Sequence, residues 1–307
     1  MSQKTLTNVA ASIRQKLLNR SRERKEDFQL VLTRYALERL LYRLSQSKYA
    51  DEFVLKGALM FLVWTDEPYR PTRDLDLLGL GENSSSRLTT VFRALCNMKQ
   101  NDGLVFKPES ITAEEIRAQQ EYEGIRLTLT VQLEQASIPL QIDIGYGDVV
   151  IPTPEQIEFP AILDMPSPSL RAYSKDSVVA EKYESMVRLG IANSRMKDFC
   201  DVWMLGRTFD FKGTTLANAI QSTFTRRRTP LPVDDPIALS KDFSEDAMKQ
   251  TQWKAFFNRS QLSLPAITLD TVTQAIRLFV LPPTQSLVKR GTFDLHWGPG
   301  GPWSIGR

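Results

Sequence analysis

Histidine is almost absent from this chain of 307 residues, which carries a single one, His296. Serine and cysteine triads need an imidazole beside the nucleophile, and most zinc sites need one on the metal. Cysteine is nearly as rare, because Cys96 and Cys200 are the only two, which argues against a disulfide scaffold or a thiolate zinc site. An enzyme of this composition would depend on carboxylates, lysines and a hard cation.

Long hydrophobic runs are also missing. The longest apolar stretch, at 58–64, is far too short to span a membrane, and the N-terminus is polar through Thr7, without the apolar block of a signal peptide. We therefore expect no membrane partner and a cytoplasmic location. The apolar share of 42% and the net charge of +3 are ordinary for a globular protein, and they permit a polyanionic partner without requiring one.

Hydrophobic periodicity predicts a mixed α/β (α+β) protein with a helical C-terminal part. We expect residues 1–165 to form an α/β domain with N-terminal helices, 166–290 a helical domain, and 291–307 an irregular tail rich in glycine and proline. The apolar spacing predicts an amphipathic helix at 28–44 and a short one at 58–64. Alternation predicts strands at 53–55, 74–78, 125–134 and 140–144, the last two forming a hairpin around a loop at 136–139. Further helices are expected from an N-cap at Ser177, and at 197–207, 214–224, 244–258 and 268–280.

Three aspartates lie on the polar faces of these strands. Asp74 and Asp76 are two residues apart, so they project from one face while Leu75 and Leu77 project from the other. Asp143 likewise alternates with apolar neighbours in its own strand. If the strands are neighbours, the carboxylates converge, and such oxygen ligands suit magnesium or manganese. The alternative is that each aspartate only marks the polar face of an edge strand.

A possible phosphate-binding turn follows the first predicted strand at Lys56, Gly57 and Ala58. Glycine lets backbone N–H groups approach a phosphate, and a helix starting at Ala58 would direct its positive dipole end toward an anion. An ordinary strand-to-helix turn would have the same sequence, so both interpretations stay open.

At this point the chain resembles the AbiEii/AbiGii nucleotidyltransferase toxins of the polymerase-beta-like nucleotidyltransferase superfamily. The resemblance spans approximately residues 27–207. It is carried by the runs FVLKGA at 53–58, RPTRDLDLLG at 70–79, QIDIG at 141–145, AEKYESMV at 180–187 and NSRMKDFCD at 193–201. The resemblance implies the superfamily's core, a mixed sheet with flanking helices.

The resemblance also assigns roles by position. The turn at Gly57 would hold a nucleoside triphosphate (NTP), and Asp74, Asp76 and Asp143 would bind Mg²⁺ or Mn²⁺, with Asp143 helping to deprotonate the attacking hydroxyl. Lys182 would neutralise the triphosphate, and Asp198 would position the acceptor or this lysine. We expect Asp201, three residues further along, to lie on a solvated or capping face.

One departure from the family pattern is Ala58. Relatives carry a serine or threonine near this position, and the missing hydroxyl contact would cost about 0.5–1.5 kcal/mol. Lys56 or Thr72 would compensate, and Thr72 would touch the nucleotide or be a point at which modification blocks the site.

The implied function is that of a toxin, paired with a cognate antitoxin, that adds nucleotides to RNA, with the tRNA 3′ end as the expected acceptor. Transfer to a small molecule or a protein hydroxyl is an alternative, and so is a non-catalytic module that binds nucleotide or RNA. If RNA is the substrate, a basic patch should hold it. The candidates are Arg226, Arg227 and Arg228, and the group from Arg20 to Lys25.

Overall fold

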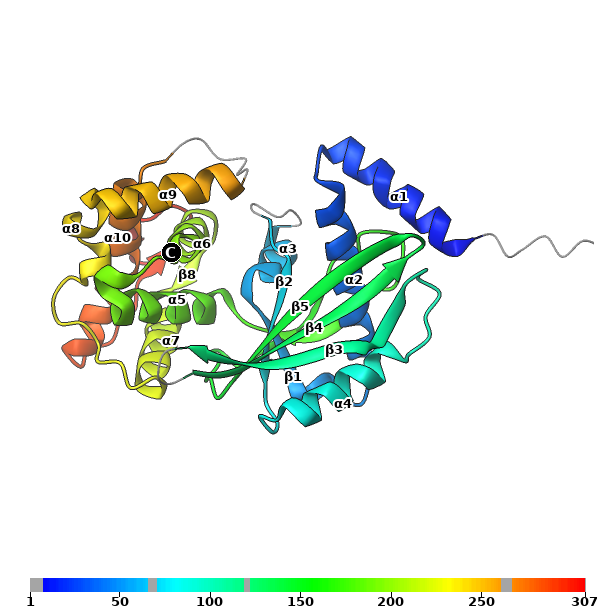
Figure 1. Cartoon of the computed structure of the whole chain (residues 1–307). Coiled ribbons are helices and arrows are strands. Elements are labelled where there is room, and N and C mark those ends of the chain that lie inside the picture. The colour runs from blue at the N-terminus through cyan, green and yellow to red at the C-terminus, as the bar shows by residue number, and fades with distance from the viewer. Residues whose placement is uncertain (1–7, 66–70, 119–121, 261–266, 307) are drawn as a thin grey trace, which may run out of the picture. The chain divides into compact units, whose positions relative to one another are not determined.

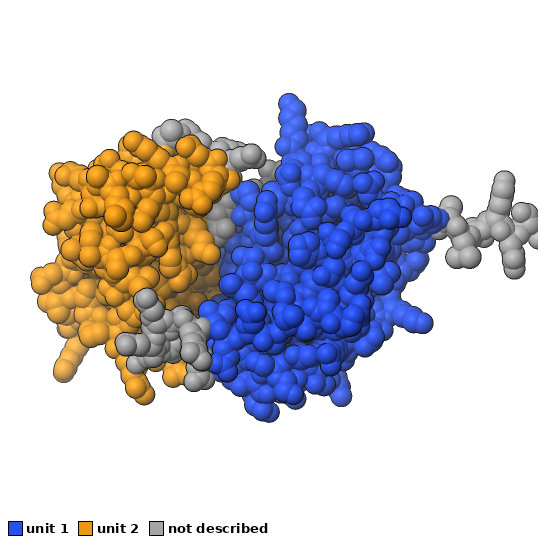
Figure 2. All heavy atoms as spheres, in the orientation of Figure 1, with its two compact units in different colours: residues 1–147, 155–172 blue, residues 148–154, 173–307 orange. Residues whose placement is uncertain are grey.

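The chain folds into two compact units, each assembled from two chain segments (Figure 2). The computed structural model describes residues 8–65, 71–118, 122–260 and 267–306. The first unit comprises residues 1–147 and 155–172, and the second comprises 148–154 and 173–307. The expected boundary at residue 165 is therefore placed too early. In addition, the segment 148–154, which we had assigned to the first domain, belongs to the second unit.

The first unit is built on a mixed sheet whose described strands run in the order β3-β4-β5-β2-β1-β7-β6. Strand β2 pairs in parallel with β5, and β1 pairs in parallel with β7, while the other neighbours are antiparallel. The strands are β1 (Phe53–Lys56), β2 (Asp74–Gly79), β3 (Val105–Ala118), β4 (Tyr122–Leu133), β5 (Ala136–Tyr146), β6 (Glu155–Glu158) and β7 (Ser169–Ala172).

The predicted hairpin is confirmed, but its turn is tighter than expected. Leu133 pairs with Ala136, so only Glu134 and Gln135 connect the strands, and Glu134 adopts a positive φ of 52°. The segment 136–139, predicted as a loop, is therefore the beginning of β5. Ile138 is buried there, which continues the inward alternation of the strand. Figure 1 shows the resulting long hairpin of β4 and β5 beside β3.

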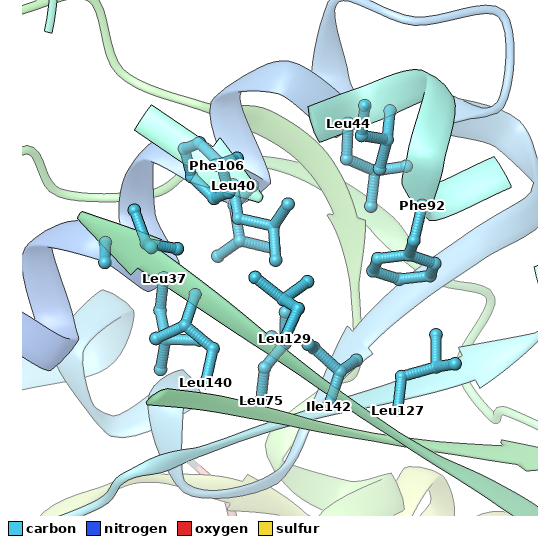
Figure 3. Close-up of a cluster of buried hydrophobic side chains, with 14 of the residues drawn as sticks. Leu37, Leu40, Leu44, Leu75, Phe92, Phe106, Leu127, Leu129, Leu140 and Ile142 are labelled. Atoms are coloured by element: carbon cyan, nitrogen blue, oxygen red, sulfur yellow. The ribbon is translucent and has the colours of Figure 1, made fainter. Parts of the chain in front are cut away.

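Helices cover the apolar face of this sheet. The helix α2 (Phe28–Ser45) has Asp27 as its N-cap, whose carboxylate accepts a hydrogen bond from Leu30 N, and it is buried on nearly every side. Figure 3 shows Leu37, Leu40 and Leu44 of α2 packing over side chains of β2, β4 and β5. The other helices of the first unit are α1 (Val9–Arg24), α3 (Met60–Thr65) and α4 (Ser85–Cys96).

The second unit is mainly helical, as expected. Helix α5 begins at Lys175 with Ser174 as its N-cap, three residues before the predicted cap at Ser177. The expected helix at 244–258 is divided at Asp246 into α8 and α9. The helices of this unit are α5 (Lys175–Leu189), α6 (Met196–Thr208), α7 (Gly213–Arg226), α8 (Lys241–Glu245), α9 (Ala247–Ser260) and α10 (Leu269–Val288). None of the described helices of either unit has the length and hydropathy of a membrane span.

The C-terminal tail is ordered, contrary to its predicted irregularity. Strands β9 (His296–Trp297) and β10 (Trp303–Ser304) join β8 (Phe211–Lys212) in a small antiparallel sheet. Trp297 is 5% exposed, and its Nε1 donates to the carbonyl of Gly206 at 2.6 Å. Five aromatic side chains of this unit pack in one cluster: Phe211, Phe279, Phe293, Trp297 and Trp303.

The tail also explains why α10 continues beyond Val280, where the sequence predicted its end. Pro282 and Pro283 lie inside the helix, and the proline at 283 has no N–H to donate to the carbonyl of Phe279. Trp303 Nε1 donates to that carbonyl instead, at 2.9 Å. A side chain from the tail thus replaces a backbone hydrogen bond that the helix cannot make.

Arg227 does not contribute to an exposed basic patch at 226–228, as the sequence predicted, because its side chain is largely buried. Its guanidinium, 10% exposed, lies within 3.2 Å of Asp148, 3.4 Å of Glu181 and 2.8 Å of Glu184. Burial alone would lower the pKa of Arg227, but the three carboxylates outweigh it and raise this pKa further above its ordinary value. Arg227 therefore joins α7 to α5 and to the segment 148–154, while Arg226 and Arg228 remain exposed.

We predict that Arg227→Ser lowers the free energy of unfolding by about 3–5 kcal/mol, because it leaves buried carboxylates without their cation. Arg228→Ser, an exposed neighbour with the same loss of charge, should change it by less than about 0.5 kcal/mol. Urea denaturation followed by circular dichroism measures both. Equal stabilities of the two variants would show that the ion pairs of Arg227 contribute nothing.

Candidate functional site

Four charged residues form a row across the polar face of the first unit's sheet. The Cα register places Lys56 of β1 opposite Asp76 of β2, Asp76 opposite Asp143 of β5, and Asp143 opposite Arg126 of β4. Asp74 lies two residues before Asp76, opposite Gln141. Residues paired in register project from the same face of a sheet. The prediction that the three aspartates lie on one face of neighbouring strands is therefore confirmed.

Gly57 is fitted against Asp76. It has a φ of +77°, and a Cβ at this position would lie 2.0 Å from Asp76 Oδ2. A side chain cannot occupy that space, so glycine is required here for both conformation and room. The helix expected at Ala58 is instead a 3-10 turn, Gly57–Leu59, followed by the six-residue α3. The turn remains a candidate for phosphate binding through its backbone, but α3 is too short to add a strong dipole.

Asp143 is held by Arg126, a residue that the sequence analysis did not single out. Arg126 Nε and a terminal nitrogen donate to the two carboxylate oxygens of Asp143 at 2.8 and 2.7 Å. This bidentate hydrogen bond raises the pKa of Arg126, with burial opposing the effect and the charges of Asp143 and Asp74 adding to it. Both oxygens of Asp143 are thus engaged by a cation.

Lys56 stands at one end of this row, and Thr72 lies beside Asp74. Lys56 Nζ lies 3.9 Å from the point where a Cβ on Gly145 would be, so the ammonium extends over β5 on the face of Asp143. Thr72 precedes β2 rather than belonging to it, and its hydroxyl donates to the backbone carbonyl of Asp74 at 3.5 Å. Thr72 is half-buried beside the first aspartate, and its contact with the nucleotide stays a prediction.

Whether this row can bind a divalent cation depends on how many carboxylate ligands the cation needs. Within the described part of the chain, no three Asp, Glu, His or Cys side chains are gathered as a metal cluster. Magnesium, however, is commonly bound by one or two carboxylates, with water and substrate phosphates completing its octahedron. Asp74 and Asp76, projecting side by side, suit that kind of site, whereas Asp143 is occupied by Arg126.

A second charged centre lies inside the second unit, where α5 and α6 meet. Lys182 Nζ is 2.5 Å from Asp198 Oδ1 and 2.9 Å from Asp201 Oδ2, and Arg195 Nε is 2.5 Å from Asp198 Oδ2. Asp198 and Asp201 are fully buried, which corrects the expectation that Asp201 lies on a solvated face. Asp198 therefore contacts the ammonium of Lys182, and its role in positioning this lysine stays a prediction.

Burial and charge act differently on the two carboxyl groups. Burial raises the pKa of Asp198, but the charges of Lys182 and Arg195 outweigh it and lower this pKa to about 2. Burial raises the pKa of Asp201 well above its ordinary value. Two buried carboxylates sharing one ammonium commonly divide in this way. The directions of the two shifts mean that Asp201 takes up a proton before Asp198 as the pH falls.

An open groove of about 370 Å³ lies between residues 194–197, at the start of α6, and the helix α9. Its lining combines cations, hydroxyls and an aromatic ring, and includes Arg195, Lys197, Phe256 and Arg259. A ring for stacking and cations for phosphates are the groups used by proteins that bind single-stranded nucleic acid. The run at 193–201 contributes half of this lining, but only the fold reveals the half from α9.

Comparison with known proteins gives one matching family and two similar solved structures. The family described as "Nucleotidyl transferase AbiEii toxin, Type IV TA system" matches residues 39–276, which is most of the chain. The crystal structure of JHP933 from Helicobacter pylori covers 86% of this chain and 95% of its own, with 13% identity and a TM-score of 0.51. A second crystal structure, described as a "putative nucleotidyltransferase from H. pylori", covers 87% and 100%, with 12% identity and a TM-score of 0.49. No curated protein matches the chain.

At such low identity the likeness to JHP933 shows a shared fold alone, and the family match carries the assignment. The matched range, 39–276, contains the positions of the glycine turn, the three aspartates, Lys182 and Asp198. The chain therefore belongs to the AbiEii nucleotidyltransferase toxin family of type IV toxin–antitoxin systems.

Proposed function

We propose that this chain transfers a nucleotidyl group from an NTP to RNA in a reaction that depends on a divalent cation. The observation that carries the proposal is the pair Asp74 and Asp76 on one strand face, with Gly57 fitted against Asp76. Because the family acts in toxin–antitoxin systems, we also propose a cognate antitoxin as the protein partner.

In the proposed reaction, a hydroxyl oxygen of the acceptor attacks the α-phosphorus of the NTP. A new P–O bond forms, the bond from the α-phosphorus to the bridging oxygen breaks, and pyrophosphate leaves. Such reactions depend on in-line geometry and neutralised charge more than on covalent participation of the protein. Asp74 and Asp76 would hold Mg²⁺ or Mn²⁺, which when bound supplies charge neutralisation at the phosphates.

The residues around this pair have separate tasks in the proposal. The backbone of the Gly57 turn binds phosphate oxygens, and the absence of a side chain at Gly57 leaves room for the carboxylate of Asp76. Lys56 adds positive charge on the same sheet face. The hydroxyl proton would go to Asp143, whose two oxygens each accept one hydrogen bond from Arg126 and keep further lone pairs for a proton.

Lys182 is proposed as a triphosphate ligand on the strength of the sequence motif. Within the second unit its ammonium, 14% exposed, is oriented by Asp198 and Asp201, which limits the rotamers open to this long side chain. A lysine held in this way loses less conformational entropy when it binds a phosphate.

The acceptor is proposed to be RNA, with the tRNA 3′ end as the specific expectation. The groove between α6 and α9 supports a nucleic-acid acceptor, because Phe256 can stack on a base while Arg195, Lys197 and Arg259 contact phosphates. Exposed Arg226 and Arg228 can add to the positive charge of the same unit. A small-molecule or protein hydroxyl would not need such a groove.

The first prediction tests the reaction and the acceptor together. Purified protein, Mg²⁺ and each α-³²P-labelled NTP are incubated separately with RNA, with protein and with small molecules, and we expect label in RNA. Asp74→Ala and Asp76→Ala should lower transfer by roughly a thousandfold or more. Their melting temperatures should stay unchanged or rise slightly, because like charges are removed.

Asp51→Ala is the matched control, since that carboxylate is 97% exposed and lies outside the row. Residual transfer in the Asp74 and Asp76 variants together with a large loss of stability would mean that both carboxylates are structural. Label in protein or small molecules alone would replace the RNA proposal, and no label anywhere would favour a non-catalytic module.

The second prediction concerns Gly57→Ala. The new Cβ collides with Asp76 Oδ2, and the positive φ costs about 1–2 kcal/mol, so we expect a small loss of stability and a large loss of transfer. Gly298→Ala is the control, because a Cβ there meets no atom within 4 Å. Wild-type transfer by Gly57→Ala would remove the turn from the site.

The third prediction concerns Lys182. Lys182→Ala should weaken NTP binding at least tenfold and also destabilise the fold by about 3–5 kcal/mol, because Asp198 and Asp201 lose their shared cation. Lys182→Arg keeps the charge and should retain part of the affinity. Binding is measured by titration calorimetry below the melting temperature of each variant. Wild-type affinity in both folded variants would refute the assignment of Lys182.

A further inference from the structure

Arg126 lies between two acidic side chains on the polar face of the sheet. It donates two hydrogen bonds to Asp143 of β5, at 2.8 and 2.7 Å, and the Cα register places Glu114 of β3 on its other side. The charge of Asp74 acts on it as well. Its side chain is nevertheless 41% exposed, whereas that of Asp143 is 21% exposed. The guanidinium is therefore held by a carboxylate and still accessible to a ligand from solvent.

The contact with Asp143 affects the neighbouring aspartate of the row. Asp143 and Asp76 are paired in register on adjacent strands, so a divalent cation at Asp76 would lie near both carboxylates. Asp143 would strengthen the binding of that cation by its negative charge. The guanidinium has the opposite effect, because it neutralises Asp143 and repels a second cation nearby. While Arg126 stays on Asp143, it therefore weakens metal binding.

A phosphate group is a suitable alternative partner for Arg126. The two N–H groups that contact a carboxylate side by side match two oxygens of a phosphate equally well. The strand β4, which carries Arg126, is two strands away from β2, which carries Asp76, and this corresponds to about 10 Å between backbones. The guanidinium reaches toward β5, the strand between them. It therefore points to the place where the phosphates of an NTP would meet a cation at Asp76.

Gln141 can keep Asp143 hydrogen-bonded when Arg126 leaves. It precedes Asp143 by two residues on β5 and therefore projects from the same face. In one orientation of its amide, the nitrogen lies 3.3 Å from both oxygens of Asp143. In the reversed orientation, the amide oxygen accepts hydrogen bonds from two nitrogens of Arg126, at 3.1 and 3.2 Å. Rotation of this one amide serves both arrangements, since one end is a donor and the other an acceptor.

We propose that Arg126 exchanges partners when substrate binds: it holds Asp143 in the free protein and moves to a phosphate group of the NTP in the complex. The exchange withdraws the positive charge that opposes the cation, so the NTP and the cation bind cooperatively. Arg126 is then a substrate-binding residue that also controls the access of the cation to Asp143. The proposal rests on the proposed function for the place of the NTP, and it does not depend on the acceptor.

The first test measures Mn²⁺ binding without NTP, through the electron paramagnetic resonance signal of free Mn²⁺. Arg126→Gln should bind Mn²⁺ about tenfold more tightly than wild type, because Asp143 is released and a positive charge is removed. Arg126→Lys, which keeps the charge but loses the planar fork, should lie between the two. Equal or weaker Mn²⁺ binding by Arg126→Gln, including no detectable binding by either protein, overturns the proposal.

Two controls assign the gain to Asp143. In an Asp143→Asn background, Arg126→Gln should tighten Mn²⁺ binding by less than about threefold, because only the repulsion between the two cations is removed. Arg93→Gln, which removes an exposed arginine of α4, should leave Mn²⁺ binding unchanged. The melting temperature of each variant reports whether it is folded. An equal gain with and without the carboxylate of Asp143 overturns the proposal.

The second test adds the nucleotide. The Mn²⁺ complex of an α,β-methylene NTP, which cannot be cleaved at that bond, is titrated into each protein and followed by calorimetry. Arg126→Gln lacks the contact with phosphate, so it should bind this complex no more tightly than wild type, despite its tighter binding of Mn²⁺ alone. A tenfold gain that persists with the NTP means that Arg126 only opposes the cation, and it overturns the exchange. A purely structural role of Arg126 would weaken the binding of Mn²⁺ and of the complex alike.

These outcomes are independent of the labelling of RNA. If Arg126→Gln gives the expected results in both tests but label never reaches RNA, the proposed function fails and the exchange stands. If label reaches RNA while Arg126→Gln binds Mn²⁺ as wild type does, the proposed function stands and the exchange fails.

Discussion

The parallel pairing of β2 with β5 is the constraint on which the candidate site depends. It fixes Asp76 beside Asp143 and Asp74 beside Gln141, and the antiparallel neighbours β1 and β4 add a cation at each end of the row. A slip of one residue would turn the aspartates toward the helices and Leu75 and Leu77 toward solvent. The free energy of burying that apolar face under α2 and α4 therefore holds together like charges that would otherwise repel each other.

Much of this sheet could be predicted because strands with one buried face alternate in sequence. Strands β1, β2 and β4 and the later part of β5 were found in this way, as was helix α2 from its apolar spacing. Helix α4 was missed even though Leu88, Val91, Phe92 and Leu95 carry the same spacing, since its neighbours in sequence are polar. The long strand β3 was missed for another reason, because it is polar, contains a proline and has an irregular register. Which strands become neighbours is set by long-range pairing, which local alternation does not encode.

The ionic interactions were the least predictable part of the protein. A run of three arginines looks like a surface patch, yet the middle one is enclosed by Asp148, Glu181 and Glu184. Arg126 looks like one more polar residue of a strand until the register places it opposite Asp143. The motifs singled out Lys182 and Asp198, but their burial and their contact with Asp201 depend on how α5 packs on α6. The spacing of charged residues in a sequence indicates which of them can form ion pairs. It does not tell whether these side chains lie at the surface or in the interior.

The division of the chain into interleaved segments limits how such proteins can be recombined in evolution or in the laboratory. The chain passes between the units after residues 147, 154 and 172, so no single cut in the gene separates one from the other. A crossover at the first boundary would leave the sheet without β6 and β7, and so without the parallel partner of β1. A crossover at the last boundary would take the acidic partner Asp148 away from Arg227. Exchange of whole units between homologues should therefore be rare, and the two units are expected to have diverged together as one inherited block.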